Sequence, residues 1–284
     1  MAEVVGICDL PGQSGMKQKL VGTYPGGLLL LLRSWQQLRS IPFGNPEKAS
    51  VIANGILADR LIAALPVDHS RFLDIGAHIG SILSAVHRKN RSISIFAIEA
   101  EKGKARSLTS RFPHCQILNF AVGEQDGTVM LQISERSGYN TIVKGESDAT
   151  FAEQQVELRM LDTLFAEEVF ETIKIDIEGA ELGALRGGAG LIERSRPTIM
   201  FESAGTGENS LGYSASKLFN WFVDNGFEIF TPDRLAHTAP PMTLPSFEDA
   251  HAYPQRTHNF FAVPVEKRSE VRTRARQILG IRAT

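Results

Sequence analysis

The sequence predicts an α/β fold: a doubly wound, mostly parallel seven-stranded sheet with an N-terminal helical extension and a β-hairpin insertion. From residue 71 onward, apolar runs typical of buried strands alternate with segments of helical period. This is the pattern of a sheet covered by helices on both faces. Two of the runs, at 72–75 and 173–177, contain acids and lead into glycines. Because open α/β sheets bind ligands at the carboxyl ends of their strands, these ends predict one shared crevice.

The composition is that of an ordinary globular chain. Its 284 residues suffice for one large domain or two small ones, and 43% are hydrophobic. The net charge of −2 gives no overall field that favours nucleic acid. The two cysteines, Cys8 and Cys115, are too few for a disulfide framework or a cysteine-ligated zinc site, which indicates a reducing, cytoplasmic setting. The longest apolar run, 28–32, is far shorter than the roughly 20 residues of a membrane-spanning helix, and the N-terminus lacks the basic region of a signal peptide.

The N-terminal part is expected to form a loose arm over 1–24 and then two helices, at 28–38 and 46–65. The second helix has apolar residues at helical spacing: Val51, Ile52, Ile56, Leu61 and Ile62. The run 28–32 fits a core helix or the interface of a homo-oligomer equally well.

The central part is expected to alternate strands and helices, with right-handed crossovers. Strands are predicted at 72–75, 93–98, 116–119, 173–177, 198–202, 227–231 and 259–263. Helices are predicted at 79–89, 101–112, 180–192 and 214–225. A long polar loop, 232–258, precedes the last strand.

Two segments depart from this alternation. Within 123–164, the stretches 128–134 and 155–160 alternate like the arms of a hairpin, with a polar loop at 135–152 between them. The tail 266–284 is basic, and we interpret it as a solvated terminal helix in preference to a nucleic-acid or membrane patch.

The first strand leads into a loop with the spacing G-x-x-x-G, formed by Gly76 and Gly80. A dinucleotide pyrophosphate loop has the spacing G-x-G-x-x-G, so a ligand without a pyrophosphate fits better. Asp74, just before the loop, suits a ligand with an amine or a cation. Glu99 ends the second strand and can accept the two hydroxyls of a ribose. Alternatively, the loop could be a plain tight turn without a ligand. Glu99 could likewise be an acid that faces solvent at the strand end.

Four side chains are candidates for removing a proton from an acceptor. Asp176 and Glu178 lie two residues apart and share a face of an extended strand. Glu202 ends the next strand, and His258 precedes the last one. The three carboxylates could instead bind a divalent cation or act as scaffold, with Lys174 pairing one of them; we expect no metal.

At these residues the chain resembles the FkbM family of class I S-adenosylmethionine-dependent methyltransferases. The pieces that carry the resemblance are 72–80, 96–100, 119–123, 161–164, 174–181 and 197–202. The specific part is Leu-Asp-Thr-Leu at 161–164 followed by Lys-Ile-Asp-Ile-Glu-Gly-Ala-Glu at 174–181. His78 is a departure, because the family usually has asparagine there.

The resemblance implies a methyltransferase domain over 70–265, flanked by the extension 1–69 and the tail 266–284. It also implies S-adenosylmethionine as methyl donor and a hydroxyl acceptor on a sugar or polyketide-type small molecule. Asp74 would lie near the methionine moiety, Glu99 would hold the ribose, and 119–121 would border the adenine. The residues implied for the donor site are Asp74, Gly76, Ala77, His78, Gly80, Glu99, Asn119 and Ala121.

Two other classes of function stay open. The first is a nucleotide-dependent oxidoreductase, against which the missing G-x-G-x-x-G argues. The second is a non-catalytic binding module that kept the fold, against which the joint presence of Asp74, Glu99 and Asp176 argues.

Overall fold

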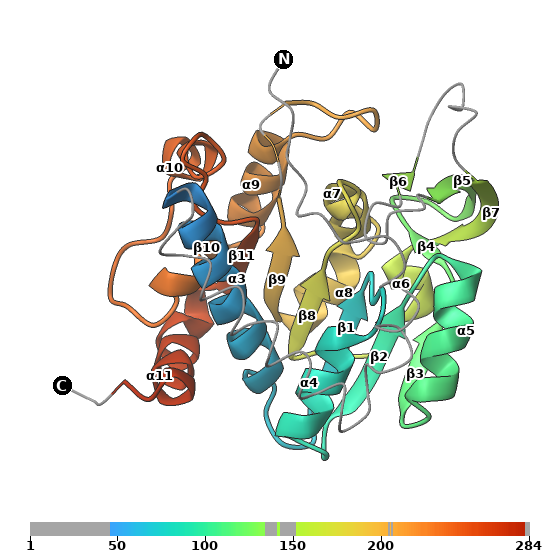
Figure 1. Ribbon diagram of the computed structural model, residues 1–284, viewed down its shortest axis with the longest axis horizontal. Coiled ribbons are helices and arrows are strands. Elements are labelled where there is room, and N and C mark those ends of the chain that lie inside the picture. The colour runs from blue at the N-terminus through green and yellow to red at the C-terminus, as the bar shows by residue number, and fades with distance from the viewer. Residues whose placement is uncertain (1–45, 134–140, 143–151, 204, 206, 282–284) are drawn as a thin grey trace.

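A computed structural model of the protein describes residues 46–133, 141–142, 152–203, 205 and 207–281. The arm 1–24 and the helix 28–38 lie outside these residues, as does most of the loop 135–152. Seven strands form one sheet in the order β10-β11-β9-β8-β1-β2-β3 (Figure 1). They are β1 (Arg71–Ile75), β2 (Ser94–Ile98), β3 (Cys115–Leu118), β8 (Thr172–Ile175), β9 (Thr198–Glu202), β10 (Phe227–Phe230) and β11 (Asn259–Pro264).

The five strands from β3 to β9 run parallel, and β11 is antiparallel to both β9 and β10. This is the doubly wound, mostly parallel sheet of the class I methyltransferase fold, as predicted. The switch point of the strand order lies between β1 and β8. Their carboxyl ends therefore diverge into helices on opposite faces, which leaves a crevice between them.

Helices cover both faces of the sheet (Figure 1). They are α3 (Pro46–Ala64), α4 (Ser81–Lys89), α5 (Lys102–Arg111), α6 (Leu161–Leu164), α7 (Glu181–Arg186), α8 (Ala189–Ser195), α9 (Ala215–Asp224), α10 (Leu244–Asp249) and α11 (Arg268–Leu279). Successive strand residues point to opposite faces. Thus Leu73 and Ile75 enter the core beneath α7, α8 and α9, whereas Phe72 enters the core beneath α3, α4 and α11.

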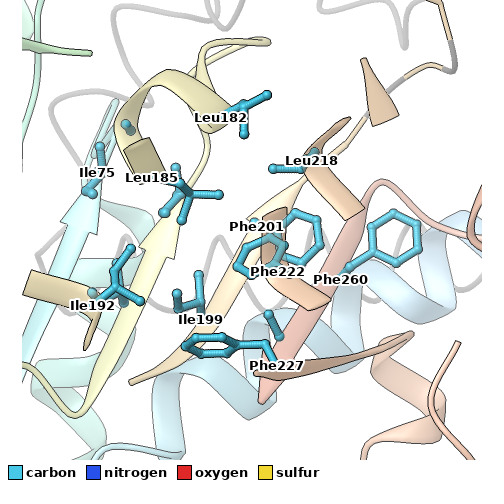
Figure 2. Close-up of a cluster of buried hydrophobic side chains, with 14 of the residues drawn as sticks. Ile75, Leu182, Leu185, Ile192, Ile199, Phe201, Leu218, Phe222, Phe227 and Phe260 are labelled. Atoms are coloured by element: carbon cyan, nitrogen blue, oxygen red, sulfur yellow. The ribbon is translucent and has the colours of Figure 1, made fainter. Parts of the chain in front are cut away.

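Aromatic side chains fill the core beneath α9 (Figure 2). The ring centroids of Phe201 on β9 and Phe222 on α9 lie 4.6 Å apart, and Phe260 on β11 stacks 5.8 Å from Phe201. All three rings are fully buried. Because these closely packed rings hold β9 rigidly, Glu202 at its end has a fixed position.

The expected hairpin is present, with β5 (Gly127–Ile133) and β7 (Ala152–Arg159) antiparallel. They join β4 (Ala121–Val122) and β6 (Thr141–Ile142) in a second sheet with the order β4-β7-β5-β6, which was not expected.

One predicted helix and one predicted loop need correction. The helix expected at 180–192 is divided into α7 and α8, because the backbone of Gly123 packs against Gly187; a Cβ there would lie 1.9 Å from the Gly123 carbonyl oxygen. The expected loop 232–258 contains a short 3₁₀ turn, η2 (Pro232–Arg234), and α10. Pro245 lies in the first turn of α10, where proline is tolerated.

The basic tail forms α11, in agreement with its interpretation as a terminal helix. Arg268 donates to the carbonyl oxygens of Leu235 and His237 at 2.8 and 2.6 Å, and its guanidinium lies 3.9 Å from the ring centroid of Phe230. Arg274 pairs with Glu171 at 2.7 Å. These arginines therefore attach α11 to the fold. Within the described residues, no helix has the length and apolar character needed to cross a bilayer.

Candidate active site

Two cavities adjoin at the carboxyl ends of β1, β2, β8 and β9. The first has a volume of about 270 Å³ and the second of about 280 Å³. Glu178 and Glu202 line both. Of the predicted site residues, the first cavity brings together Gly76, His78, Glu99, Ala121, Asp176, Glu178 and Glu202.

The loop after β1 is held against β8 and β2. Gly76 has φ of 82°, and a Cβ on it would lie 1.9 Å from the carbonyl oxygen of Asp176. The amides of Gly76 and Ala77 both donate to the carbonyl oxygen of Ile98, at 2.9 and 3.1 Å. Only glycine fits this approach and this φ, so the wall of the first cavity is backbone at this point.

Gly80 and Ala77 have structural places outside the cavity lining. Gly80 has φ of 81°, and a Cβ there would lie 2.5 Å from the ring of Phe112. Ala77 is buried. Gly80 therefore lets α4 begin close to α5, and its predicted contact with a donor stays a prediction.

Glu99 is buried at the end of β2 and lines the first cavity. Its Oε2 accepts from the amide of His78 at 2.8 Å, and its Oε1 accepts from the amide of Glu101 at 2.9 Å. Burial raises the pKa of Glu99, although the two amides oppose that rise. Since each carboxylate oxygen can accept a second hydrogen bond, Glu99 remains able to accept from a pair of hydroxyls.

His78 also lines the first cavity. Burial and then the positive charges of Lys104 and Lys174 lower the pKa of His78 to about 4. Its imidazole is therefore neutral at pH 7, with one ring nitrogen as donor and one as acceptor. A neutral donor and acceptor at this position resembles an asparagine amide in its hydrogen-bonding capacity.

Asn119 supports the cavity from outside. Its Nδ2 donates to the carbonyl oxygens of Glu99 and Ala100 at 2.8 and 2.9 Å, which fixes the end of β2. The wall itself is apolar there and comes from the start of the second sheet. It consists of Phe120, Ala121, Val122 and Leu131.

Asp74 lines neither cavity, and its place near a ligand stays a prediction. Its side chain is 1% exposed and pairs with Lys174, with Oδ1 and Nζ 3.2 Å apart. Burial raises the pKa of Asp74, although Lys174 opposes that rise. Strand residues alternate between the two faces, so Asp74 lies on the same face as Phe72, where Lys174 is its neighbour on β8.

Lys174 is the residue whose importance the sequence understated. Its side chain is 7% exposed, and its Nζ lies 2.8 Å from the carbonyl oxygen of Gly76 and 3.3 Å from Oδ2 of Asp176. Burial alone would lower the pKa of Lys174, but the carboxylates of Asp176 and Asp74 raise it, so the ammonium stays charged. The signal in the sequence is a lysine inside an otherwise apolar strand.

Three carboxyl groups meet where the cavities adjoin. Oxygens of Asp176, Glu178 and Glu202 all lie within 4.8 Å of one another. Burial and then the charge of Asp176 raise the pKa of Glu202 to about 10. Burial would raise that of Asp176 too, but Lys174 and a hydrogen bond from Glu202 lower it. Asp176 is thus the anion of the pair and Glu202 the proton carrier.

Glu178 and Glu181 complete the acidic boundary. Glu178 reaches solvent at the rim and has φ of 55°. Partial burial and then the charges of Asp176 and Glu181 raise its pKa to about 7. Glu181 is buried, and its Oε1 accepts from the amides of Ile177 and Gly179 at 3.0 and 3.2 Å. Glu181 therefore shapes the turn that carries Glu178.

The second cavity lies between α7 and α9, and no sequence motif pointed to it. Asn209 and Tyr213 line it. Asn209 Nδ2 donates to the carbonyl oxygen of Gly179 at 2.8 Å, and Tyr213 Oη donates to Oε1 of Glu124 at 2.8 Å. Their segment joins β9 to α9, so only the folded chain brings it to the acidic boundary.

His258 lines neither cavity, although it lies beside the end of β9, which carries Glu202. Its Nδ1 lies 3.0 Å from Nε2 of Gln255, and its carbonyl oxygen accepts from the amide of Ser203 at 2.9 Å. The start of β11 pairs with the end of β9, with Asn259 opposite Glu202.

Comparison with known proteins now identifies the family. The model of the methyltransferase FkbM domain matches residues 74–229, more than half of the chain. The chain belongs to the FkbM methyltransferase family. A search of the curated proteins finds no match. The family match runs from the end of β1 to β10 and so includes both cavities.

Among solved structures, the chain is similar in fold to methyltransferases of low sequence identity. Methyltransferase FkbM from Methylobacillus flagellatus is 16% identical with a TM-score of 0.44, and the match covers 69% of this chain and 43% of that one. A TehB-like SAM-dependent methyltransferase from Corynebacterium glutamicum is 13% identical with a TM-score of 0.38, covering 84% and 96%. A precorrin-6y C5,15-methyltransferase from Geobacter metallireducens is 14% identical with a TM-score of 0.37, covering 62% and 73%.

Proposed function

We propose that this methyltransferase uses S-adenosylmethionine and methylates a hydroxyl of a small molecule of the sugar or polyketide type. The observation that carries the proposal is the pair of adjoining cavities with Asp176, Glu178 and Glu202 at their boundary. One cavity has the features of a nucleoside site, and the other provides space for an acceptor next to an ionised acid.

The residues of the first cavity fit the donor. Gly76 leaves a backbone cradle that a Cβ would fill. Glu99 offers carboxylate oxygens to ribose hydroxyls, and the apolar wall around Ala121 suits a purine face. When bound, S-adenosylmethionine supplies a methyl group already activated by its sulfonium, so the protein's task is mainly alignment.

An acceptor hydroxyl must lose its proton as its oxygen attacks. Asp176 is the acid held ionised at the boundary, and we assign it the role of general base. Glu202 and Glu178 hold and pass protons beside it, since their pKa values are raised to about 10 and about 7. His258, outside both cavities, takes no part in this assignment.

The lining of the second cavity supports an acceptor without negative charge. Among the described residues that line it, the charged ones are all acids, namely Glu178, Glu181 and Glu202. A phosphate or carboxylate there would lack a cationic partner. Divalent cations also prefer such oxygen ligands, but Lys174 already provides Asp176 with a positive partner, so we assign these groups to proton transfer.

Calorimetry with S-adenosylhomocysteine and with NADH, followed by assay of methyl transfer to a panel of hydroxylated sugars and polyketides, tests the proposal. We expect S-adenosylhomocysteine to bind and one class of hydroxyl to be methylated. Binding of NADH alone would favour an oxidoreductase, and donor binding without turnover of any hydroxyl would favour a binding module. The cytoplasmic location remains an expectation from the two cysteines.

A further inference from the structure

The ammonium of Lys174 contacts three oxygens at the ends of β1 and β8, two of them from Gly76 and Asp176, which line the first cavity. It lies 2.8 Å from the carbonyl oxygen of Gly76, 3.2 Å from Oδ1 of Asp74 and 3.3 Å from Oδ2 of Asp176. Gly76 belongs to the loop after β1, Asp74 to β1 itself and Asp176 to the end of β8. One side chain thus contacts both the loop and the acid to which the proposed function assigns the proton transfer.

Neutralising a buried acid does not account for these contacts. A counter-ion for Asp74 would need only that carboxylate, yet the shortest contact of Lys174 is to the uncharged carbonyl of Gly76. The charges of both Asp176 and Asp74 favour the charged state of the lysine. The ammonium donates to the carbonyl oxygen of Gly76 and forms ion pairs with both carboxylates.

We propose that Lys174 is a positioning residue, which fixes the Gly76 carbonyl beneath the donor and holds the Asp176 carboxylate at the cavity wall. This inference rests on the proposed function. The Gly76 and Ala77 amides bond to Ile98 of β2, and the lysine adds a hydrogen bond to this loop from β8. The loop and the acid therefore keep a fixed mutual position, which an in-line transfer requires.

The test compares Lys174→Met with the double variant Lys174→Met/Asp74→Asn. The single variant leaves Asp74 buried without its cation, so a loss of stability in denaturant is expected. The double variant removes that unpaired acid and should recover stability. If Lys174 positions the site, the double variant still binds S-adenosylhomocysteine about tenfold more weakly, the size of one lost charge-assisted hydrogen bond.

A second readout follows Asp176 directly. With ¹³C-carboxyl-labelled aspartate, the NMR signal of Asp176, assigned by its loss in Asp176→Asn, should titrate at higher pH in the double variant than in the wild type. Lys217→Met is the matched control: Lys217 also bonds a carboxylate, that of Glu208, and a glycine carbonyl, that of Gly212, but lines neither cavity. We expect it to bind S-adenosylhomocysteine as the wild type does.

Wild-type donor affinity together with an unchanged Asp176 titration in the double variant would overturn the inference, because Lys174 would then serve only Asp74. Failure of the wild type to bind S-adenosylhomocysteine would instead remove the proposed donor. In that case the Asp176 titration, which needs no ligand, still decides whether Lys174 holds the acid.

Discussion

The turn at Gly76 shows how closely the ends of β1 and β8 approach each other. The backbone of one strand end occupies the place of a side chain on the other, and the amide of Asp176 donates to the carbonyl oxygen of Ile75 at 3.0 Å. Sequence spacing identified this glycine as important. A glycine is needed here because of a backbone contact between two strand ends that are distant in sequence. The spacing of residues within one strand cannot predict such a contact.

Gly76→Ala should abolish detectable binding of S-adenosylhomocysteine in calorimetry. The added methyl group has no space and the φ of 82° is unfavourable for alanine, so the loop must move away from β8. Gly55→Ala in α3 is the control, because a Cβ there meets nothing within 4 Å. Donor affinity within twofold of wild type for Gly76→Ala would contradict the account of this loop.

Glu99→Gln should weaken donor binding by about tenfold or more, because an amide group replaces one of the two oxygens that accept from His78 and Glu101. Calorimetry with S-adenosylhomocysteine measures this. Glu153→Gln, on the exposed part of β7, provides the control. Equal affinities for the two variants would remove Glu99 from the ribose site.

Asp176→Asn should leave donor affinity within about threefold and lower the rate of methyl transfer by about 10²-fold or more, as expected for loss of a general base. An asparagine keeps the shape of the side chain but cannot accept the proton. Single-turnover kinetics with an acceptor that the wild type methylates gives the rate of the chemical step. A normal rate would show that another group removes the proton.

At the scale of elements, the short helix α6 explains the Leu-Asp-Thr-Leu motif. The carboxylate of Asp162 accepts from the amides of Gly190 and Leu191 at 3.0 and 2.6 Å, and the amide of Asp162 donates to the carbonyl oxygen of Gly187 at 3.0 Å. Asp162 therefore supplies, from a distant segment, the acceptors that the first turn of α8 needs.

Asp162→Ala should lower the free energy of unfolding by about 1–2 kcal/mol, the usual cost of a lost N-terminal helix cap. Urea denaturation followed by circular dichroism measures it. Thr163→Ala changes an exposed residue of the same helix, and its effect should stay within about 0.5 kcal/mol. A similar effect of both substitutions would mean that α8 does not depend on this carboxylate.

At the scale of the whole molecule, the seven strands of the main sheet could be predicted because each is largely apolar, even the half-buried edge strand β3. The break between α7 and α8 could not, because it depends on the contact of Gly187 with Gly123, which is distant in sequence. In the candidate site, Glu99 and Asp176 could be predicted, because each follows directly from the end of an apolar strand. The second cavity was missed because Asn209 and Tyr213 reach it through a loop without a recognisable pattern.

The acidic boundary also makes stability depend on pH. Glu202 has its pKa raised to about 10 in the folded protein, from 4.5 as its ordinary value. Between these pH values the folded state holds a proton that the unfolded state has lost, so this group's contribution to stability falls as pH rises. Glu202→Gln should match wild type near pH 5 and exceed it near pH 9 by at least about 1 kcal/mol, the equivalent of one pKa unit.

Urea denaturation of both proteins at the two pH values measures this difference. Glu228→Gln on β10 is a control outside both cavities. A Glu202→Gln variant that is less stable than wild type at pH 9 would mean that Glu202 is ionised in the folded protein.

Glu178 and Glu202 line both cavities. The binding of a ligand in one cavity should therefore affect the binding of a ligand in the other. Whatever fills one side changes the charge and hydration that the other side meets. By thermodynamic linkage, if the first ligand changes the affinity for the second by some factor, the second changes the affinity for the first by the same factor. Affinities measured one compound at a time will therefore differ from those within the ternary assembly, and screening for the missing acceptor should be done on protein already loaded with S-adenosylhomocysteine.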